Sequence, residues 1–414
     1  MMICSLDLGK FKSVACFYDC KTRKFSFEAI LTRRSHIDKL LDDNEFDLLV
    51  MEACGPSGWI SDVCQQREIK TLVCSTNDEA WMWNKTKRKT DRDDALKLAK
   101  MAAMGVLTPV HVPKPEIREQ RAIIKYRKNL DGRITRIKNG IRSTFANRGI
   151  EIDTGARAWN TGRVHIDSFR KSIAECTCDD LWKGQLDLEL TQLDALTAEM
   201  QAVEDRLELF AADNPLIQIV MTIPGVGRKT AELLVAIIDD PHRFKSARHL
   251  SSYLGLTPKQ YQSGETDRNG KISKRGPKLA RTMLLECAWA SLRYNAWSKK
   301  TFERIHGGSK TRRKKAGIAL ARKIAVVAWA MMRDQQAWDQ SKALQEAVTD
   351  PGTQELMEEA TEPHEAKPKK KAKLLRAKPH PPGPVISDEP KQRSGRGSKP
   401  TRRRGSKRRS PLKT

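Results

Sequence analysis

Acidic residues, long apolar runs and paired cysteines are all scarce in this sequence of 414 residues. It contains 51 Asp and Glu against 77 Lys and Arg, a formal net charge of +26 at pH 7 that favours a polyanionic partner such as nucleic acid. No apolar run is long enough to cross a membrane and no signal peptide is recognisable, so we expect no membrane partner.

The nine cysteines include no C-x-x-C pair, and their number is odd. Cys176 and Cys178 are too close together and too isolated for a usual zinc site. Most of the others lie within apolar runs. We therefore expect reduced thiols in a cytosolic protein.

The positive charge is concentrated at the end of the chain. Residues 366–414 contain 18 Lys and Arg against two acids, a net +16 that leaves +10 for residues 1–365, and they hold 8 of the 19 prolines. Such a segment buries too little apolar surface to offset its ordering entropy, so we expect it to be disordered. It would serve as a solubilising or targeting tail, or as a non-specific phosphate-binding arm.

The first hundred residues alternate between strand and helix patterns. Three antiparallel strands are expected first, followed by alternating helices and strands. The strands are predicted at 1–9, 13–19, 24–31, 47–53 and 69–74, and the helices at 36–43, 56–66 and 91–103. The continuous apolar run at 47–53 is typical of a strand buried on both faces. This order is the outline of an α/β, RNase H-like fold.

The remaining folded part is expected to be helical. A basic helix at 117–149 and apolar residues at coiled-coil spacing in 193–210 predict two long helices that pair, within one chain or between two. Later helices are expected at 278–294 and 314–333, with a polar, glycine-rich loop at 259–276. The expected parts are an α/β domain at 1–113, a helical coiled-coil spacer at 114–212, a mostly helical domain at 213–335, and a linker and tail at 336–414.

Four acidic residues stand out against this basic background. Asp7 and Glu52 lie near the ends of two apolar strands, where an ionised carboxylate without a partner is costly. Asp91 and Asp94 share one face of the helix that starts at residue 91. In an RNase H-like sheet these two strands are neighbours and the later helix packs beside them, so we expect the four carboxylates to converge. They would then hold two Mg²⁺ ions about 4 Å apart, suited to a phosphodiester exchange.

Each acidic residue also has a purely structural interpretation. Asp7 precedes a turn at Gly9, Glu52 fits the edge of a sheet, and Asp91 fits a helix N-cap. Taken singly, these interpretations are at least as good as a metal site. Together they are weaker, because they must account for acids on three elements. The alternative ligands are Asp78, Glu79 and Asp93.

The last folded part contains residues suited to binding phosphate. Residues 223–240 are expected to form two short helices that turn at Gly225 and Gly227, a helix-hairpin-helix arrangement. Such a turn offers backbone N–H groups to a nucleic-acid phosphate, although a tight turn without a ligand is an equally good interpretation. The adjacent Arg228 and Lys229 favour phosphate.

A serine in the expected loop lies among cations. Ser263 could attack phosphorus while these cations stabilise the transition state. No histidine accompanies it in the sequence, so its chemistry alone indicates an ordinary loop serine. The cations are Arg268, Lys271, Lys274 and Arg275.

These motifs together resemble one family, the transposases of the insertion-sequence 110 group, including its 1111 branch. The segments LDLGK, VMEACGP and KTDRDDA are similar to the family's first-strand aspartate, its glutamate and its K-T-D-x-x-D-A motif. Residues 223–281 and 316–333 resemble its C-terminal transposase domain. The resemblance covers about residues 3–335, with both halves in family order.

The resemblance implies a RuvC-like domain with a DEDD set of acids, a dimerising coiled coil and a C-terminal domain with a nucleophilic serine that forms a phosphoserine link to DNA. The implied partners are element and target DNA, a non-coding bridge RNA in some members, and further copies of the chain in a dimer or tetramer. The implied location is the cytoplasm of a prokaryote, at the nucleoid. Helix 117–149 and the first domain are candidate RNA contacts. By motif position the Mg²⁺ ligands are Asp7, Glu52, Asp91 and Asp94, and the nucleophile is Ser263, with Ser273 as its competitor.

Two features depart from the family pattern, the basic tail after about residue 365 and Pro277 after K-R-G. Neither changes a proposed catalytic position. The leading hypothesis is therefore a DNA recombinase of a mobile element. The alternatives are a metal-dependent junction nuclease, in which water attacks and Ser263 only shapes a loop, and a catalytically inactive nucleic-acid-binding protein.

Overall fold

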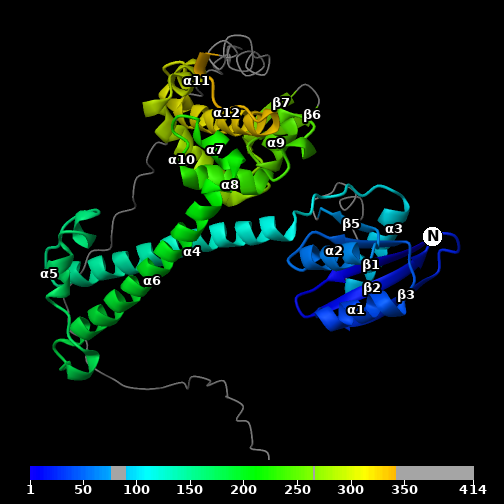
Figure 1. Ribbon diagram of the computed structural model, residues 1–414, viewed down its shortest axis with the longest axis horizontal. Coiled ribbons are helices and arrows are strands. Elements are labelled where there is room, and N and C mark those ends of the chain that lie inside the picture. The colour runs from blue at the N-terminus through cyan, green and yellow to red at the C-terminus, as the bar shows by residue number, and fades with distance from the viewer. Residues whose placement is uncertain (76–89, 264–265, 342–414) are drawn as a thin grey trace, which may run out of the picture. The chain divides into compact units, whose positions relative to one another are not determined.

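The computed structural model describes residues 1–75, 90–263 and 266–341 (Figure 1). The predicted tail and the alternative ligands Asp78 and Glu79 lie outside the described residues. In the described ranges no helix is both long enough and apolar enough to cross a membrane. All nine cysteines are free thiols.

The N-terminal domain is built on a five-stranded sheet of order β3-β2-β1-β4-β5. β2 pairs antiparallel with both β1 and β3, whereas β4 is parallel to β1 and β5. The expected antiparallel set and the adjacency of the first and fourth strands are confirmed. The strands are β1 (Met2–Leu8), β2 (Lys12–Asp19), β3 (Phe25–Leu31), β4 (Leu48–Glu52) and β5 (Thr71–Cys74).

Helices cover both faces of this sheet. α1 (Arg34–Asp43) and α2 (Ser57–Gln66) pack on one face, where Leu6 joins their apolar residues in one buried cluster. α3 (Asp91–Ala103) packs on the opposite face, in a second cluster that contains Ile3. Side chains alternate between the faces of a strand, so each strand contributes to both clusters. The strand β4, which lies between β1 and β5, is buried on both faces, as its apolar run predicts.

Two long helices follow, α4 (Pro115–Ala146) and α6 (Leu181–Ala212). They run in opposite directions and pack against each other (Figure 1). Phe145 of α4 and Leu193 of α6 share one buried cluster, and Leu207 lies in another with a residue of α4. The predicted apolar seam is therefore used within one chain, while pairing between chains stays a prediction. The connection contains η2 (Arg157–Trp159), α5 (Arg163–Asp167) and η3 (Ile173–Glu175).

The C-terminal region is a helical bundle with one β-hairpin. Its largest buried cluster draws on most of the helices after α6. The elements are α7 (Pro215–Met221), α8 (Arg228–Ile238), η4 (Pro241–Arg243), α9 (Ala247–Tyr253), β6 (Pro258–Ser263), β7 (Thr266–Ile272), α10 (Lys278–Tyr294), α11 (Ala296–His306), η5 (Lys310–Arg312) and α12 (Arg313–Asp334).

Two expectations for this region are wrong. Residues 259–276 are not a loop, because β6 and β7 form an antiparallel hairpin whose order comes from backbone pairing. The successive residues Lys259, Gln260 and Tyr261 are all exposed, so no apolar alternation announces the strand. Residues 223–227 are the turn itself, and the helix that precedes it is α7, which ends at Met221.

A buried group of charges joins α4, α6 and α8. Arg127 of α4 lies 2.5 Å from Glu232 of α8 and 3.5 Å from Glu204 of α6. Arg228 adds contacts of 3.0 Å to Glu204 and 3.5 Å to Glu232. Glu232 is only 1% exposed, and burial raises its pKa although both arginines act in the opposite direction. The helical spacer is thus tied to the C-terminal bundle by paired charges.

Replacing Arg127 with methionine should lower the free energy of unfolding by about 3–5 kcal/mol, because Glu232 stays buried without its nearest partner. Urea denaturation followed by circular dichroism measures this change. The loss should shrink as the pH is lowered, because protonation of Glu232 removes the unpaired charge. Arg133→Met, on the exposed surface of the same helix, is the matched control and should cost less than about 0.5 kcal/mol. Equal losses in the two variants would contradict this role.

Candidate active site and nucleic-acid interface

Asp7 and Glu52 lie side by side at the ends of β1 and β4. The two parallel strands pair Leu6 with Met51, so the next residue along each strand is an acid. Both acids are half-buried. The pKa of the Cys54 thiol is raised by its partial burial and by the negative charges of Glu52 and Asp7, which indicates that both carboxylates are near it. The structure therefore brings these two predicted residues together.

The helix α3 covers the face of the sheet on which these acids lie. Ser5 donates a hydrogen bond of 2.7 Å from its Oγ to the main-chain oxygen of Ala95 in α3. Residues two apart share a face of a strand, so Asp7 lies on the α3 side. Val50 packs in the same cluster as the α3 residues, which puts Glu52 on that side as well. The start of α3 thus lies over the sheet face that carries both acids.

The first turn of α3 distinguishes its three aspartates. The N-cap is Thr90, so the N-cap interpretation of Asp91 is wrong. The Thr90 hydroxyl accepts a hydrogen bond of 3.2 Å from the N–H of Asp93 and donates one of 2.6 Å to the Asp93 carboxylate. Asp93 therefore stabilises the helix start. Asp94 is half-buried, whereas Asp91 is exposed.

Across the residues that the structure describes, no three His, Cys, Asp or Glu side chains come close enough together to hold a metal ion. Asp7 and Glu52 are adjacent and Asp94 belongs to the helix above them, but the four carboxylates do not form a closed cage. Their chemistry nevertheless fits a hard divalent cation, because carboxylate oxygens are the ligands that Mg²⁺ prefers.

The second group of predicted residues lies on the β6–β7 hairpin and the turn after it. Ser263 pairs with Thr266 and is the last residue of β6. Its side chain lies outside the described atoms, so the structure places only its main chain. All four predicted cations are exposed, namely Arg268, Lys271, Lys274 and Arg275.

The K-R-G turn after β7 is held by close backbone contacts. Gly255 and Gly276 have φ values of +68° and +87°, and a Cβ at either position would lie 1.9 Å from a main-chain oxygen of the other segment. Arg281 of α10 donates hydrogen bonds of 3.1 and 3.0 Å to the main-chain oxygens of Arg275 and Gly276. The Ser273 hydroxyl is buried, without a hydrogen-bond partner in the described part of the chain. The turn therefore presents its cations from a fixed backbone.

The glycine turn between α7 and α8 packs partly inward. A Cβ on Gly225, whose φ is +94°, would lie 2.6 Å from the Cα of Ser291 in α10, whereas the equivalent position at Gly227 has nothing within 4 Å. Arg228 lies in the buried charge group, and the Lys229 ammonium contacts Glu204. The Gly227 side of the turn is therefore open, while both predicted cations have partners inside the protein.

Lys278 and Arg281 also adjoin this candidate interface, although neither is among the residues predicted from the sequence. Both belong to the first turns of α10, directly after the K-R-G turn. Their spacing of three residues places them on one helix face, and that spacing was the signal that could have found them.

Two transposase families match separate parts of the chain. Residues 217–303 match the "Transposase IS116/IS110/IS902 family", and residues 4–147 match the DEDD transposases of the IS110 type, described as "Transposase". The matched range 4–147 contains all four predicted acids, and the matched range 217–303 contains Ser263. The predicted acids and the predicted serine thus lie in separate matched regions.

Several relatives match much of the chain. The transposase for insertion sequence element IS1111A of Coxiella burnetii is 28% identical over 307 residues, which cover 70% of this chain and 79% of the relative. A probable family 20 transposase of Pseudomonas aeruginosa is 27% identical over 290 residues, 69% of this chain and 83% of the relative. The pilin gene-inverting protein of Moraxella lacunata is 28% identical over 255 residues, which cover 61% of this chain and 68% of the relative. With an α/β domain that carries the acids and a helical domain that carries the serine, the chain belongs to the IS110 family of transposases.

Proposed function

We propose that this transposase cleaves and rejoins DNA at the ends of an insertion sequence by metal-dependent transesterification, with Ser263 as the nucleophile. The observation that carries the proposal is the placement of Asp7 and Glu52 on adjacent strand ends, on the sheet face covered by α3. Elements far apart in the sequence thereby contribute acids to one region of a strongly basic protein.

Asp7, Glu52, Asp91 and Asp94 would hold two Mg²⁺ ions in this proposal. Backbone pairing fixes the two strand residues, and the Thr90–Asp93 cap fixes the start of the helix that carries the other two. Carboxylates repel one another unless a cation lies between them, so their final approach depends on the bound ion. Bound Mg²⁺ would activate the attacking oxygen and stabilise the leaving oxygen.

Ser263 would supply the attacking oxygen. Its Oγ forms a bond to phosphorus while the bond from phosphorus to a sugar oxygen breaks, and the hydroxyl proton is released. The exposed cations Arg268 and Lys271 would stabilise the additional negative charge of the transition state. The phosphoserine bond replaces one phosphate ester with another, so a strand hydroxyl can later displace the serine and rejoin the DNA.

The partners in this proposal are the element ends, the target DNA, a non-coding guide RNA and further copies of the chain. The exposed residues Lys125, Arg133 and Arg136 of α4 support a contact with RNA phosphates. They lie on the long helix that the resemblance to the family marks as a candidate RNA contact.

Incubating the protein with labelled element and target DNA, the flanking non-coding transcript and Mg²⁺ should yield a covalent protein–DNA adduct. The adduct should survive denaturing electrophoresis, and it should be absent with a chelator or without the transcript. Cleavage without an adduct would support the junction nuclease, in which water is the nucleophile. Binding without cleavage would support the catalytically inactive protein.

A further inference from the structure

A groove in the C-terminal domain lies beside the hairpin and is not used by the proposed chemistry. Its volume is about 260 Å³, and its apolar lining includes Ile272, Leu285 and Ile318. This volume is below the roughly 300–1,000 Å³ of pockets that hold drug-sized ligands, so the groove suits a single ring system. No acidic side chain is among the described residues that line it.

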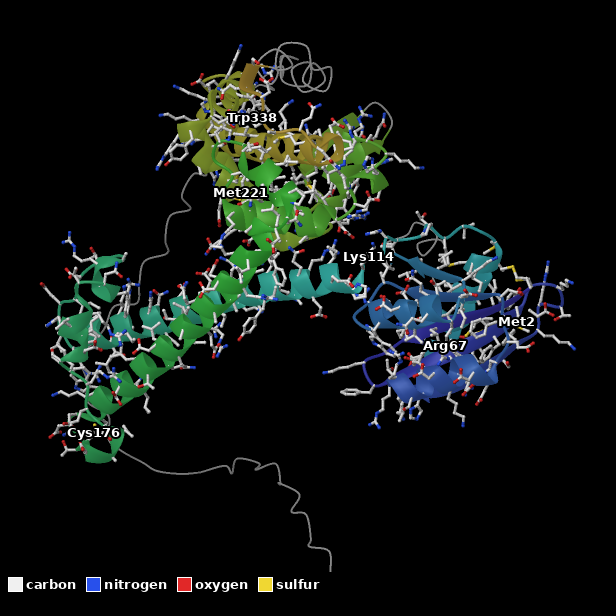
Figure 2. All side chains as sticks on the ribbon, viewed as in Figure 1. Met2, Arg67, Lys114, Cys176, Met221 and Trp338 are labelled. Carbon is white, nitrogen blue, oxygen red and sulfur yellow. The ribbon has the colours of Figure 1, made fainter. Side chains whose placement is uncertain are left out.

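Cationic side chains line this groove and follow it along α12. Lys274 and Lys278 line it beside the K-R-G turn, and both are exposed. Ile318 and Ala321 line it from α12, and Lys314 is four and seven residues before them, on the same helix face. Figure 2 shows nitrogen-tipped side chains projecting from the helices of this domain. An apolar surface flanked by positive charge matches a nucleotide, which joins an apolar ring to anionic phosphates.

The start of α12 concentrates positive charge where a helix disfavours it. Residues 310–315 read KTRRKK, with five cations and no acid, and the first turn of α12 contains no acid either. Cations are unfavourable near the positive end of the helix dipole. A bound polyanion would offset this cost, because its phosphates interact favourably with both the lysines and the helix start.

We propose that this groove holds one unstacked nucleotide of the DNA strand that is being cleaved, and this proposal rests on the proposed function. The base lies against Ile272 and Ile318, and the flanking phosphates lie on Lys274, Lys278 and Lys314. Ile272 is six residues from Thr266, the partner of Ser263, which is roughly 20 Å along a strand. The held nucleotide is therefore only a few positions from the phosphate that Ser263 attacks. Enzymes that act on DNA bases likewise extrude a nucleotide from the stack into a pocket lined by apolar side chains.

The test uses full-length protein and single-stranded DNA with 2-aminopurine at each position in turn, because this base becomes fluorescent when it is unstacked. We expect enhancement at one position. Lys278→Gln with Lys314→Gln should weaken binding about tenfold. The negative slope of log K against log salt should become less steep by about 1.4, which is about 0.7 for each lost phosphate contact. The matched control, Lys299→Gln with Lys300→Gln on α11, removes the same charge from exposed positions outside the groove lining and should leave both quantities unchanged.

A second variant tests the apolar surface separately. Ile318→Gln should abolish the fluorescence enhancement while leaving the salt slope unchanged. Circular dichroism confirms that each variant is folded. The proposal would be overturned if the lysine variant and its control changed DNA affinity equally, or if 2-aminopurine fluorescence increased at no position. Tighter binding of RNA of the same sequence would overturn the choice of DNA. Binding is measured without Mg²⁺ and without cleavage, so failure of the serine chemistry would not affect this result.

Discussion

Replacing Ser263 with alanine should abolish the covalent protein–DNA adduct and lower strand transfer by at least about 10³-fold. Alanine lacks the oxygen that bonds to phosphorus, and water in its place gives a hydrolysed end instead of an end that can be rejoined. DNA affinity should be unchanged, because the hairpin cations remain. Denaturing electrophoresis of labelled DNA measures the adduct, and a filter-binding assay measures the affinity.

The matched control for this prediction is Ser273→Ala, ten residues further along the same segment. The Ser273 hydroxyl is buried and has no hydrogen-bond partner among the described residues, so its removal leaves no group unsatisfied. This variant should form the adduct at the wild-type rate. If Ser273→Ala lost the adduct and Ser263→Ala kept it, Ser273 would be the nucleophile and the proposed assignment would be wrong.

The sheet of the N-terminal domain could be predicted because burial imposes a pattern on its strands. Residues 48–51 are apolar on both faces of the strand, and the structure buries Leu49, Val50 and Met51 in β4. The hairpin β6–β7 could not be predicted, because most of its residues are polar and no apolar alternation marks its strands, although Ile272 at the end of β7 packs against the core. The helix α11 was also missed. Its N-cap signal is Asn295, whose side chain accepts a hydrogen bond of 3.3 Å from the N–H of Ser298.

The site could be predicted in part for a similar reason. The adjacency of Asp7 and Glu52 follows from the strand order, which the pattern indicates. The difference between Asp93 and its neighbours could not be predicted, because it depends on Thr90 being the N-cap. The partners of Arg228 could not be predicted either, since Glu204 lies on another helix and approaches only in the folded chain.

Changing Asp94 to asparagine should lower Mg²⁺-dependent cleavage by at least about 10²-fold. The variant loses one of the negative charges that would hold the two proposed Mg²⁺ ions. Asparagine has nearly the same shape, so the helix should remain in place. Asp7→Asn should have an effect of similar size, since its carboxylate belongs to the same proposed ligand set. Cleavage of labelled DNA over a range of Mg²⁺ concentrations measures both effects.

The Asp93→Asn variant controls for a change of charge in the same helical turn. Asp93 accepts a hydrogen bond from Thr90, so this change should cost about 0.5–1.5 kcal/mol of stability and leave cleavage intact. A second readout is thermal unfolding without DNA. Mg²⁺ at a hundredfold excess over its Kd should raise the free energy of unfolding of the wild type by about 2.7 kcal/mol. The Asp93→Asn variant should gain the same amount, whereas the Asp94→Asn variant should lose most of this gain. If Mg²⁺ stabilised all three proteins to the same extent, or none of them, the carboxylates at this sheet face would not be its ligands and the metal-dependent part of the proposal would fail.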